Sequence, residues 1–178
     1  MKRIFHLLLI TLSLSTLRAQ EPGEDLLAWN ASRKLSWSDY KAAPNPGSDA
    51  AATTTTYLSI DYHISGNNFS YTIKSWFSRT LSWGRHKTSY ILSHEQGHFD
   101  IAEIYARKLH RRMSEYRFDK DSYRKELKRV YDEVTGEKAG LQEQYDRETQ
   151  HSINKEKQAE WEKKIRSMLE ELKDYADY

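Results

Sequence analysis

The hydrophobic periodicity of the chain changes near residue 86, and this change constrains the fold more than any other feature of the sequence. Between positions 54 and 64, apolar and polar side chains alternate, which is the pattern of a half-buried β-strand. The alternation resumes at Phe69, Tyr71 and Ile73, after the turn-forming residues Ser-Gly-Asn-Asn. We therefore predict a β-hairpin over residues 53–77.

From Thr88 onward, the spacing of apolar side chains becomes helical. Thr88 or Ser89 is a suitable N-cap for a first helix. The residues that follow along one face, three or four positions apart, are Ile91, His94, His98, Ile101, Tyr105 and Leu109. A second helix is predicted over about 122–148, with a weak point at Gly136, and a third from near Asn154 toward the C-terminus. Strands followed by helices predict an α+β domain with an N-terminal antiparallel sheet.

The first nineteen residues differ from the rest of the chain. Lys2 and Arg3 form a basic start, positions 4–14 are mostly apolar, and Leu-Arg-Ala at 17–19 fits a cleavage site. The apolar run is too short for a membrane span, which needs about 20 residues. We therefore predict a signal peptide over residues 1–19 and a secreted or periplasmic mature protein without a membrane span.

The composition of the remaining chain excludes several classes of protein. Three of the 28 basic residues lie in the predicted signal peptide, which leaves 25 basic residues against 26 acidic ones. This balance gives no reason to expect a nucleic-acid partner. The sequence contains no cysteine, so it has neither disulfides nor an acceptor for a lipid anchor, and a packed core or a bound metal must stabilise it. We expect one domain over residues 20–172 and a polar, frayed C-terminal tail over residues 173–178.

The segment His94-Glu95-Gln96-Gly97-His98 carries the clearest chemical signal. Histidines four residues apart in a helix lie one above the other, so both imidazoles can bind one metal ion. Glu95 is rotated by about 100° from His94 around the helix, so it can approach the open side of the metal without binding it. There it can accept a proton from a water molecule. This HExxH pattern is that of zinc metallopeptidases.

A catalytic zinc site takes three protein ligands and keeps one position open, so the two histidines need a partner. The metzincin pattern would place a glycine at position 101 and a histidine at position 104, but both positions hold isoleucine, which excludes that class. The later chain offers Asp146, Glu148 and His151 as candidates. We favour His151, because neutral imidazole suits zinc and no other histidine follows His110.

These residues also give the chain a resemblance to a known bacterial family. The similarity lies around the HExxH pattern, in Tyr145-Asp-x-x-Thr-x-His151, in Gln158-x-x-Trp161, and upstream in Leu-Ser-Trp-Ser-Asp-Tyr (35–40) and Ala-Ala-Thr (51–53). The family it resembles is one of predicted secreted zinc-dependent proteases, catalogued as a domain of unknown function within the zincin-like superfamily. The resemblance implies a zincin-like fold and peptidase chemistry, and it names no substrate. One departure is Ser152, where the family often has glycine, which predicts a different turn there.

The sequence therefore predicts a secreted zinc-dependent metallopeptidase of zincin type that acts on a peptide or protein substrate. Zinc would be bound by His94, His98 and His151, with Glu95 as the general base and Tyr145 as a hydrogen-bond donor to the developing oxyanion. An exposed edge of the predicted hairpin would hold an extended substrate. Two alternatives are also consistent with the sequence: a non-catalytic envelope protein with a structural metal site, and a helical interaction module without metal.

Overall fold

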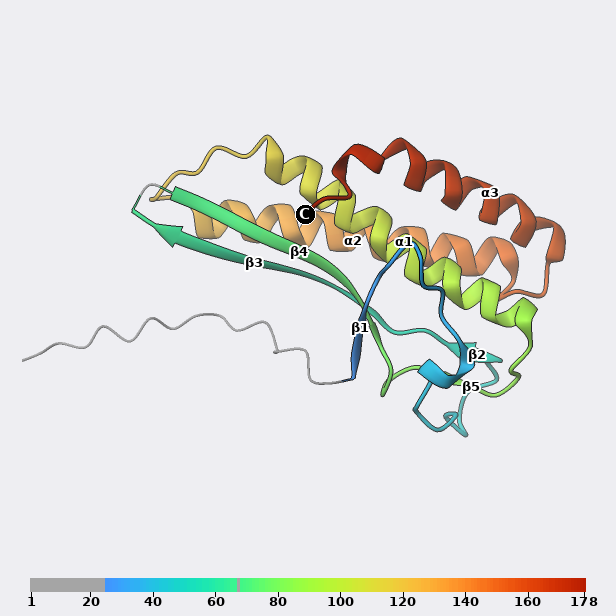
Figure 1. Cartoon of the computed structure of the whole chain (residues 1–178). Helices are drawn as coiled ribbons and strands as arrows, with labels where there is room; N and C mark the ends of the chain where they lie inside the picture. Colours follow the sequence, from blue (N-terminus) through green and yellow to red (C-terminus); the bar gives the residue numbers. More distant parts are fainter. Residues whose placement is uncertain (1–24, 67) are drawn as a thin grey trace, which may run out of the picture.

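The computed structural model describes residues 25–66 and 68–178, so the predicted signal peptide lies outside the described residues. Its strands are β1 (Leu26–Ala28), β2 (Ala52–Thr53), β3 (Thr56–Ser65), β4 (Asn68–Ser78) and β5 (Trp83–Gly84). Its helices are α1 (Ser89–Ser114), α2 (Tyr123–Thr149) and α3 (Lys155–Glu171), with short 3-10 helices η1 (Trp37–Asp39) and η2 (Lys173–Tyr175). This order, strands first and helices after, agrees with the predicted α+β class (Figure 1).

β3 and β4 form the predicted hairpin as an antiparallel pair along the full length of β3. β1 pairs with the other side of β4, so the strand order is β1-β4-β3 and β3 lies at an edge of this sheet. Leu58, Ile73 and Phe77 lie on the face of the hairpin that is buried in the core, as the alternation predicts. The predicted start at residue 53 is wrong, because Ala52–Thr53 forms β2, which pairs with β5 in a separate sheet.

The predicted starts of α1 and α3 are confirmed by their N-caps. The side chain of Thr88 accepts a hydrogen bond from the backbone N–H of Ile91 (3.1 Å), and that of Asn154 accepts one from Lys157 (3.1 Å). α2 continues through Gly136, so the predicted weak point does not break the helix. None of the described helices is both long and apolar enough to cross a membrane.

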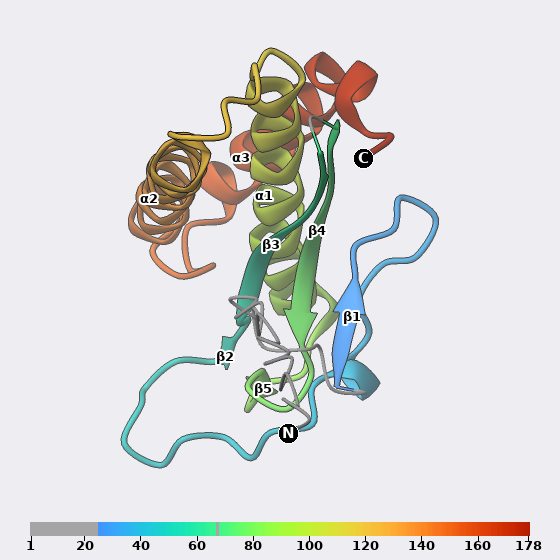
Figure 2. The ribbon, with the colours of Figure 1, turned by 90° about the vertical axis from the view of Figure 1, so that its left-hand side faces the viewer.

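α1 lies at the centre of the domain, with the β3–β4 hairpin along one side and α2 and α3 on the others (Figures 1 and 2). Every residue from Ile101 to Arg107 is buried, so this part of the helix has no solvent-facing side. The prediction of a single apolar face is therefore too narrow. The sequence did not indicate the second buried face because that face contains the charged residues Glu103 and Arg107. In the structure these two residues form a buried ion pair, with Arg107 Nε 2.9 Å from Glu103 Oε1.

The C-terminal residues 173–178 do not form the frayed tail that we predicted. Tyr175 and Tyr178 pack against the hydrophobic core. The Tyr178 hydroxyl donates to Glu103 Oε2 (2.5 Å), which also accepts a hydrogen bond from Ser75 Oγ (2.8 Å). A buried carboxylate needs such donors because an unpaired buried charge is costly. The folded domain therefore extends beyond the predicted boundary at residue 172.

Candidate metal centre

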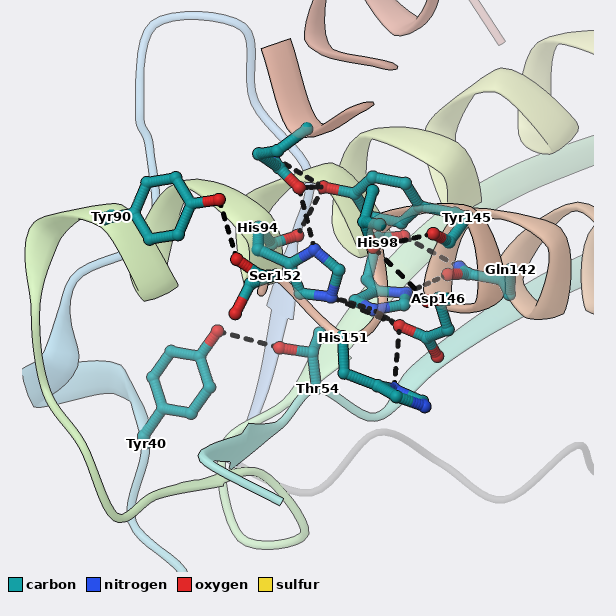
Figure 3. A network of polar contacts seen from close by, with 12 residues as sticks. Tyr40, Thr54, Tyr90, His94, His98, Gln142, Tyr145, Asp146, His151 and Ser152 are labelled. Carbon is teal, nitrogen blue, oxygen red and sulfur yellow. Dashed lines mark hydrogen bonds and ion pairs between the residues drawn. The ribbon is translucent and has the colours of Figure 1, made fainter. Parts of the chain in front are cut away.

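α1 and α2 together bring three metal-binding side chains into contact (Figure 3). His94 and His98 lie one turn apart on α1, and Asp146 faces them from α2. His94 Nε2 and His98 Nε2 lie 3.1 and 3.0 Å from Asp146 Oδ1, and 3.3 Å from each other. The two histidines of the sequence pattern thus meet a carboxylate from a second helix.

A glutamine fixes the orientation of each imidazole. His94 Nδ1 lies 2.9 Å from Gln158 Oε1 of α3, and His98 Nδ1 is hydrogen bonded to Gln142 Oε1 of α2. Since an amide oxygen can only accept a hydrogen bond, both Nδ1 atoms carry a proton. The hydrogen bonds to Asp146 need a second proton, on Nε2; when Nε2 loses that proton, its lone pair faces Asp146. This is the tautomer that a histidine needs to bind a metal through Nε2.

The three donor atoms fit a zinc ion. Zinc bonds of roughly 2.0–2.1 Å to nitrogen or oxygen, at tetrahedral angles, place neighbouring ligand atoms about 3.3 Å apart. The separations between His94 Nε2, His98 Nε2 and Asp146 Oδ1 are close to this value. Two imidazole nitrogens and a carboxylate oxygen are also donors that suit zinc. The residues present therefore fit a metal ion held by three protein ligands.

The electrostatics of the cluster also favour a cation. Burial alone would lower the pKa of His98, but the hydrogen bond to Asp146 and the charge of that residue outweigh burial and raise the pKa above its usual value. Burial alone would raise the pKa of Asp146, but hydrogen bonds from His94 and His98 hold it well below its usual range. Asp146 is therefore ionised at neutral pH, as a metal ligand must be.

Glu95 lies close to the cluster as a buried carboxylate with an unused oxygen. The residue is 4% exposed, and its Oε2 has no hydrogen-bond partner among the described residues. Burial has the larger influence on the pKa values of His98 and Tyr40, but the charge of Glu95 contributes to raising both. An unpaired buried carboxylate oxygen is costly. The predicted general base thus has a free acceptor that a bound molecule could satisfy.

Tyr145 is not positioned to donate a hydrogen bond to a developing oxyanion, as we had predicted. Its fully buried ring stacks on the imidazole of His94, with 4.5 Å between the ring centroids. Its hydroxyl donates to the backbone carbonyl of His94 (3.2 Å) and accepts a hydrogen bond from Gln158 Nε2 (2.9 Å). A hydroxyl held inside the core cannot reach a developing oxyanion. Tyr145 therefore positions His94 instead.

Gly97 allows the close approach of α2 to α1. A Cβ atom at position 97 would lie 2.5 Å from Tyr145 Oη and 2.8 Å from Tyr145 Cζ, which is closer than real Cβ contacts. Glycine inside a helix costs about 1 kcal/mol relative to alanine. This cost falls at a position where any side chain would collide with Tyr145.

Glu148, one of the three candidates for the third ligand, binds other side chains with both of its carboxylate oxygens. Its Oε1 accepts a hydrogen bond from Gln144 Nε2 (2.7 Å), and its Oε2 accepts one from Trp161 Nε1 (2.8 Å). Because Trp161 belongs to α3, these contacts join α2 to α3. Of the two acidic candidates, the structure brings Asp146 to the histidines.

His151, the candidate that we favoured, lies at the edge of the cluster. Its side chain is 76% exposed, and its Nδ1 is 3.5 Å from Asp146 Oδ1 (Figure 3). It belongs to a turn in which Gln150, His151 and Ser152 have φ values of 50°, 52° and 74°. This left-handed region is one that glycine enters without strain. Ser152 thus has the backbone conformation expected of the glycine that the resemblance implies at this position, and its carbonyl accepts a hydrogen bond from Tyr90 Oη (2.7 Å).

Sequence reasoning missed the orienting roles of Gln142 and Gln158. Gln142 precedes Asp146 by four residues, so the pair matches the spacing of the histidines on α1, and Gln142 Nε2 also donates to the backbone carbonyl of His98 (2.8 Å). That spacing is the signal that could have identified Gln142. Gln158 reaches His94 only because α3 returns along α1, which no local pattern predicts.

A groove of about 360 Å³ opens beside the cluster. It lies between α2 and the residues that lead into β3. Its lining residues are Thr54, Thr55, Thr56, His98, Thr135, Lys138, Ala139, Gln142 and Asp146. The groove therefore gives a ligand direct access to two side chains of the cluster, His98 and Asp146.

Fold and site together define an α+β protein with a candidate metal centre on its central helix. The chain belongs to a bacterial family of unknown function, since the family model described as "Bacterial protein of unknown function (DUF922)" matches residues 14–152. The matched range includes all three residues of the cluster. No curated protein and no solved structure shows a significant match. The predicted resemblance is thus confirmed at the level of the family, to which no activity is assigned.

Replacing Asp146 should weaken zinc binding far more than replacing His151. Asp146 Oδ1 contacts both Nε2 atoms, whereas His151 is exposed at the edge of the cluster. We expect Asp146→Ala to raise the dissociation constant for zinc by more than about a hundredfold, and His151→Ala by less than about tenfold. Competition with a chromogenic zinc chelator measures both values. An equal or larger effect in His151→Ala would make His151 the third ligand.

Gly97→Ala should destabilise the domain, because Tyr145 must shift to make room for the methyl group. We expect the free energy of unfolding to fall by about 1–3 kcal/mol in urea denaturation. Gly140→Ala in α2 is the matched control, since nothing lies within 4 Å of a Cβ atom there. The control should raise stability by about 0.5–1 kcal/mol. If both substitutions stabilise the protein, the contact at Gly97 is not the constraint inferred here.

Proposed function

We propose that this protein is a zinc-dependent metallopeptidase with a zincin-like fold. The observation that carries the proposal is a pairing of two features: three convergent donor atoms, and a buried oxygen of Glu95 without a partner among the described residues. A structural zinc site uses four protein ligands, whereas a catalytic one uses three and keeps a position for water or substrate. The cluster of His94, His98 and Asp146 favours the second kind of site.

The side chains of the site have distinct roles in peptide hydrolysis. Zinc, when bound, would acidify a water molecule and polarise the carbonyl group of the peptide bond. Glu95 accepts the proton that the water loses as its oxygen attacks the carbonyl carbon. The same carboxyl group then donates this proton to the amide nitrogen as the C–N bond breaks, which leaves a carboxylic acid and an amine. Gln142 and Gln158 keep the two imidazoles in the binding tautomer throughout.

We expect an extended peptide to bind along the groove, but the edge of the hairpin is less available than we predicted. Tyr131 Oη of α2 donates to the carbonyl of Leu58 (2.6 Å), and Lys138 Nζ donates to that of Thr56 (2.9 Å). These contacts occupy acceptors that a substrate strand would need. Main-chain pairing of a substrate with this part of β3 would therefore have to do without the carbonyls of Thr56 and Leu58.

The alternative is a non-catalytic protein that uses the same residues as a structural metal site. It would need a fourth protein ligand. His151 is the nearest candidate, with Nδ1 3.5 Å from Asp146 Oδ1. Its 76% exposure, together with the unpartnered oxygen of Glu95, favours the catalytic proposal.

We also propose that the protein is exported. The support is the basic start and the short apolar run of residues 1–19. Mass spectrometry of the protein recovered from the periplasm or the culture medium should find an amino terminus at Gln20 or Glu21. A chain in these fractions that retains Met1 would contradict export by a cleaved signal peptide.

Glu95→Gln tests the peptidase mechanism, because glutamine keeps the shape of the side chain and removes its basicity. We expect the variant to keep its zinc and its melting temperature, and to hydrolyse an unfolded-protein substrate about a hundredfold more slowly or worse. His98→Ala is the contrasting variant and should lose both zinc and hydrolysis. Cleavage by Glu95→Gln at the parent rate would refute the mechanism. A zinc-loaded parent protein that cleaves nothing in a broad peptide library would favour the structural alternative.

A further inference from the structure

The groove contains a lysine that lies away from the metal-binding residues. Lys138, Gln142 and Asp146 follow one another at four-residue spacing on α2, and all three line the groove. With a rise of 1.5 Å per residue, Lys138 lies about 12 Å along the helix axis from Asp146. The lysine therefore stands beside the path that an extended peptide would take toward the cluster.

Lys138 is held in place and has hydrogen-bonding capacity to spare. Its Nζ donates to the backbone carbonyl of Thr56 (2.9 Å), and no ion pair joins it to an acidic side chain among the described residues. Burial lowers the pKa of Lys138 to about 8, so the group is still charged at neutral pH. An ammonium group has three N–H donors, so two are left for a ligand. A half-buried cation without a counter-charge is unfavourable unless a ligand supplies one.

The surroundings of Lys138 suit an anion. Of the threonines that line the groove, Thr56 is the one whose hydroxyl group has no hydrogen-bond partner among the described residues, so this hydroxyl can donate to a ligand. Asp146 is the one acidic side chain in the lining, and a divalent cation bound to it would cancel its charge. The loaded groove would therefore have a positive potential near Lys138, which favours a carboxylate over an apolar side chain.

We propose that Lys138 forms a subsite for a carboxylate of the substrate, so that the groove prefers peptides with an acidic side chain or a free C-terminus near the scissile bond. The inference rests on the proposed function, because it assumes a peptide bound at the metal cluster. An extended chain advances about 3.3 Å per residue, so the 12 Å between Lys138 and Asp146 spans roughly three to four residues. The carboxylate would thus lie within a few residues of the scissile bond.

Peptide binding to the zinc-loaded Glu95→Gln protein tests this subsite without cleavage. The probes are short alanine-rich peptides labelled with fluorescein, with glutamate or glutamine at matched positions and with a free or amidated C-terminus. Fluorescence anisotropy should show that a carboxylate peptide binds about tenfold more tightly than its neutral counterpart. Adding Lys138→Gln should abolish this advantage, since glutamine keeps a hydrogen-bond donor but has no charge. Adding Lys138→Arg should preserve it.

The arms of this experiment separate the sources of the carboxylate. An advantage of glutamate in amidated peptides identifies an acidic side chain, and an advantage of the free C-terminus identifies the terminal carboxylate. Equal binding of charged and neutral peptides, no binding of either, or an advantage that persists in Lys138→Gln would overturn the subsite. The proposed peptidase activity is tested separately, by comparing the rates at which the parent protein and Glu95→Gln cleave a substrate.

Discussion

The close contact of α1 and α2 at Gly97 and Tyr145 is the interaction on which the site depends. Because position 97 has no side chain, the Tyr145 ring can stack on His94 and its hydroxyl can reach the His94 carbonyl. This contact fixes both the distance and the rotation of α2 relative to α1. Asp146 is the next residue on α2, so the same contact places its carboxylate against His94 and His98. A larger residue at position 97 would displace both Tyr145 and the neighbouring Asp146 from the two histidines.

Each histidine is held at two points, its ring and its own backbone. Gln142 bonds both Nδ1 and the carbonyl of His98. Gln158 bonds Nδ1 of His94 and, through Tyr145, the carbonyl of the same residue. An imidazole held in this way cannot rotate without breaking contacts to a neighbouring helix. The ligand atoms are therefore organised before a metal binds, which reduces the free energy lost on ordering them.

Local features of the fold could be predicted from the sequence, whereas features set by helix packing could not. The hairpin follows from alternation, and the caps at Thr88 and Asn154 follow from residue type. The HExxH pattern identified the two histidines because both lie on one helix. The preference for His151 rested on the chemistry of zinc, but the backbone decides the geometry: α2 extends to Thr149 and leaves His151 in the left-handed turn beyond it. The burial of α1 on all sides likewise depends on where α2 and α3 pack.

The position of bound zinc is the most direct test of the central claim. Crystals of the zinc-loaded protein, measured by anomalous diffraction at the zinc absorption edge, would locate the ion and its ligands. We predict one zinc ion per chain, bound by Nε2 of His94, Nε2 of His98 and Oδ1 of Asp146, with a solvent molecule in the fourth position. Zinc bound by four protein ligands, or no zinc at these three residues, would contradict the account.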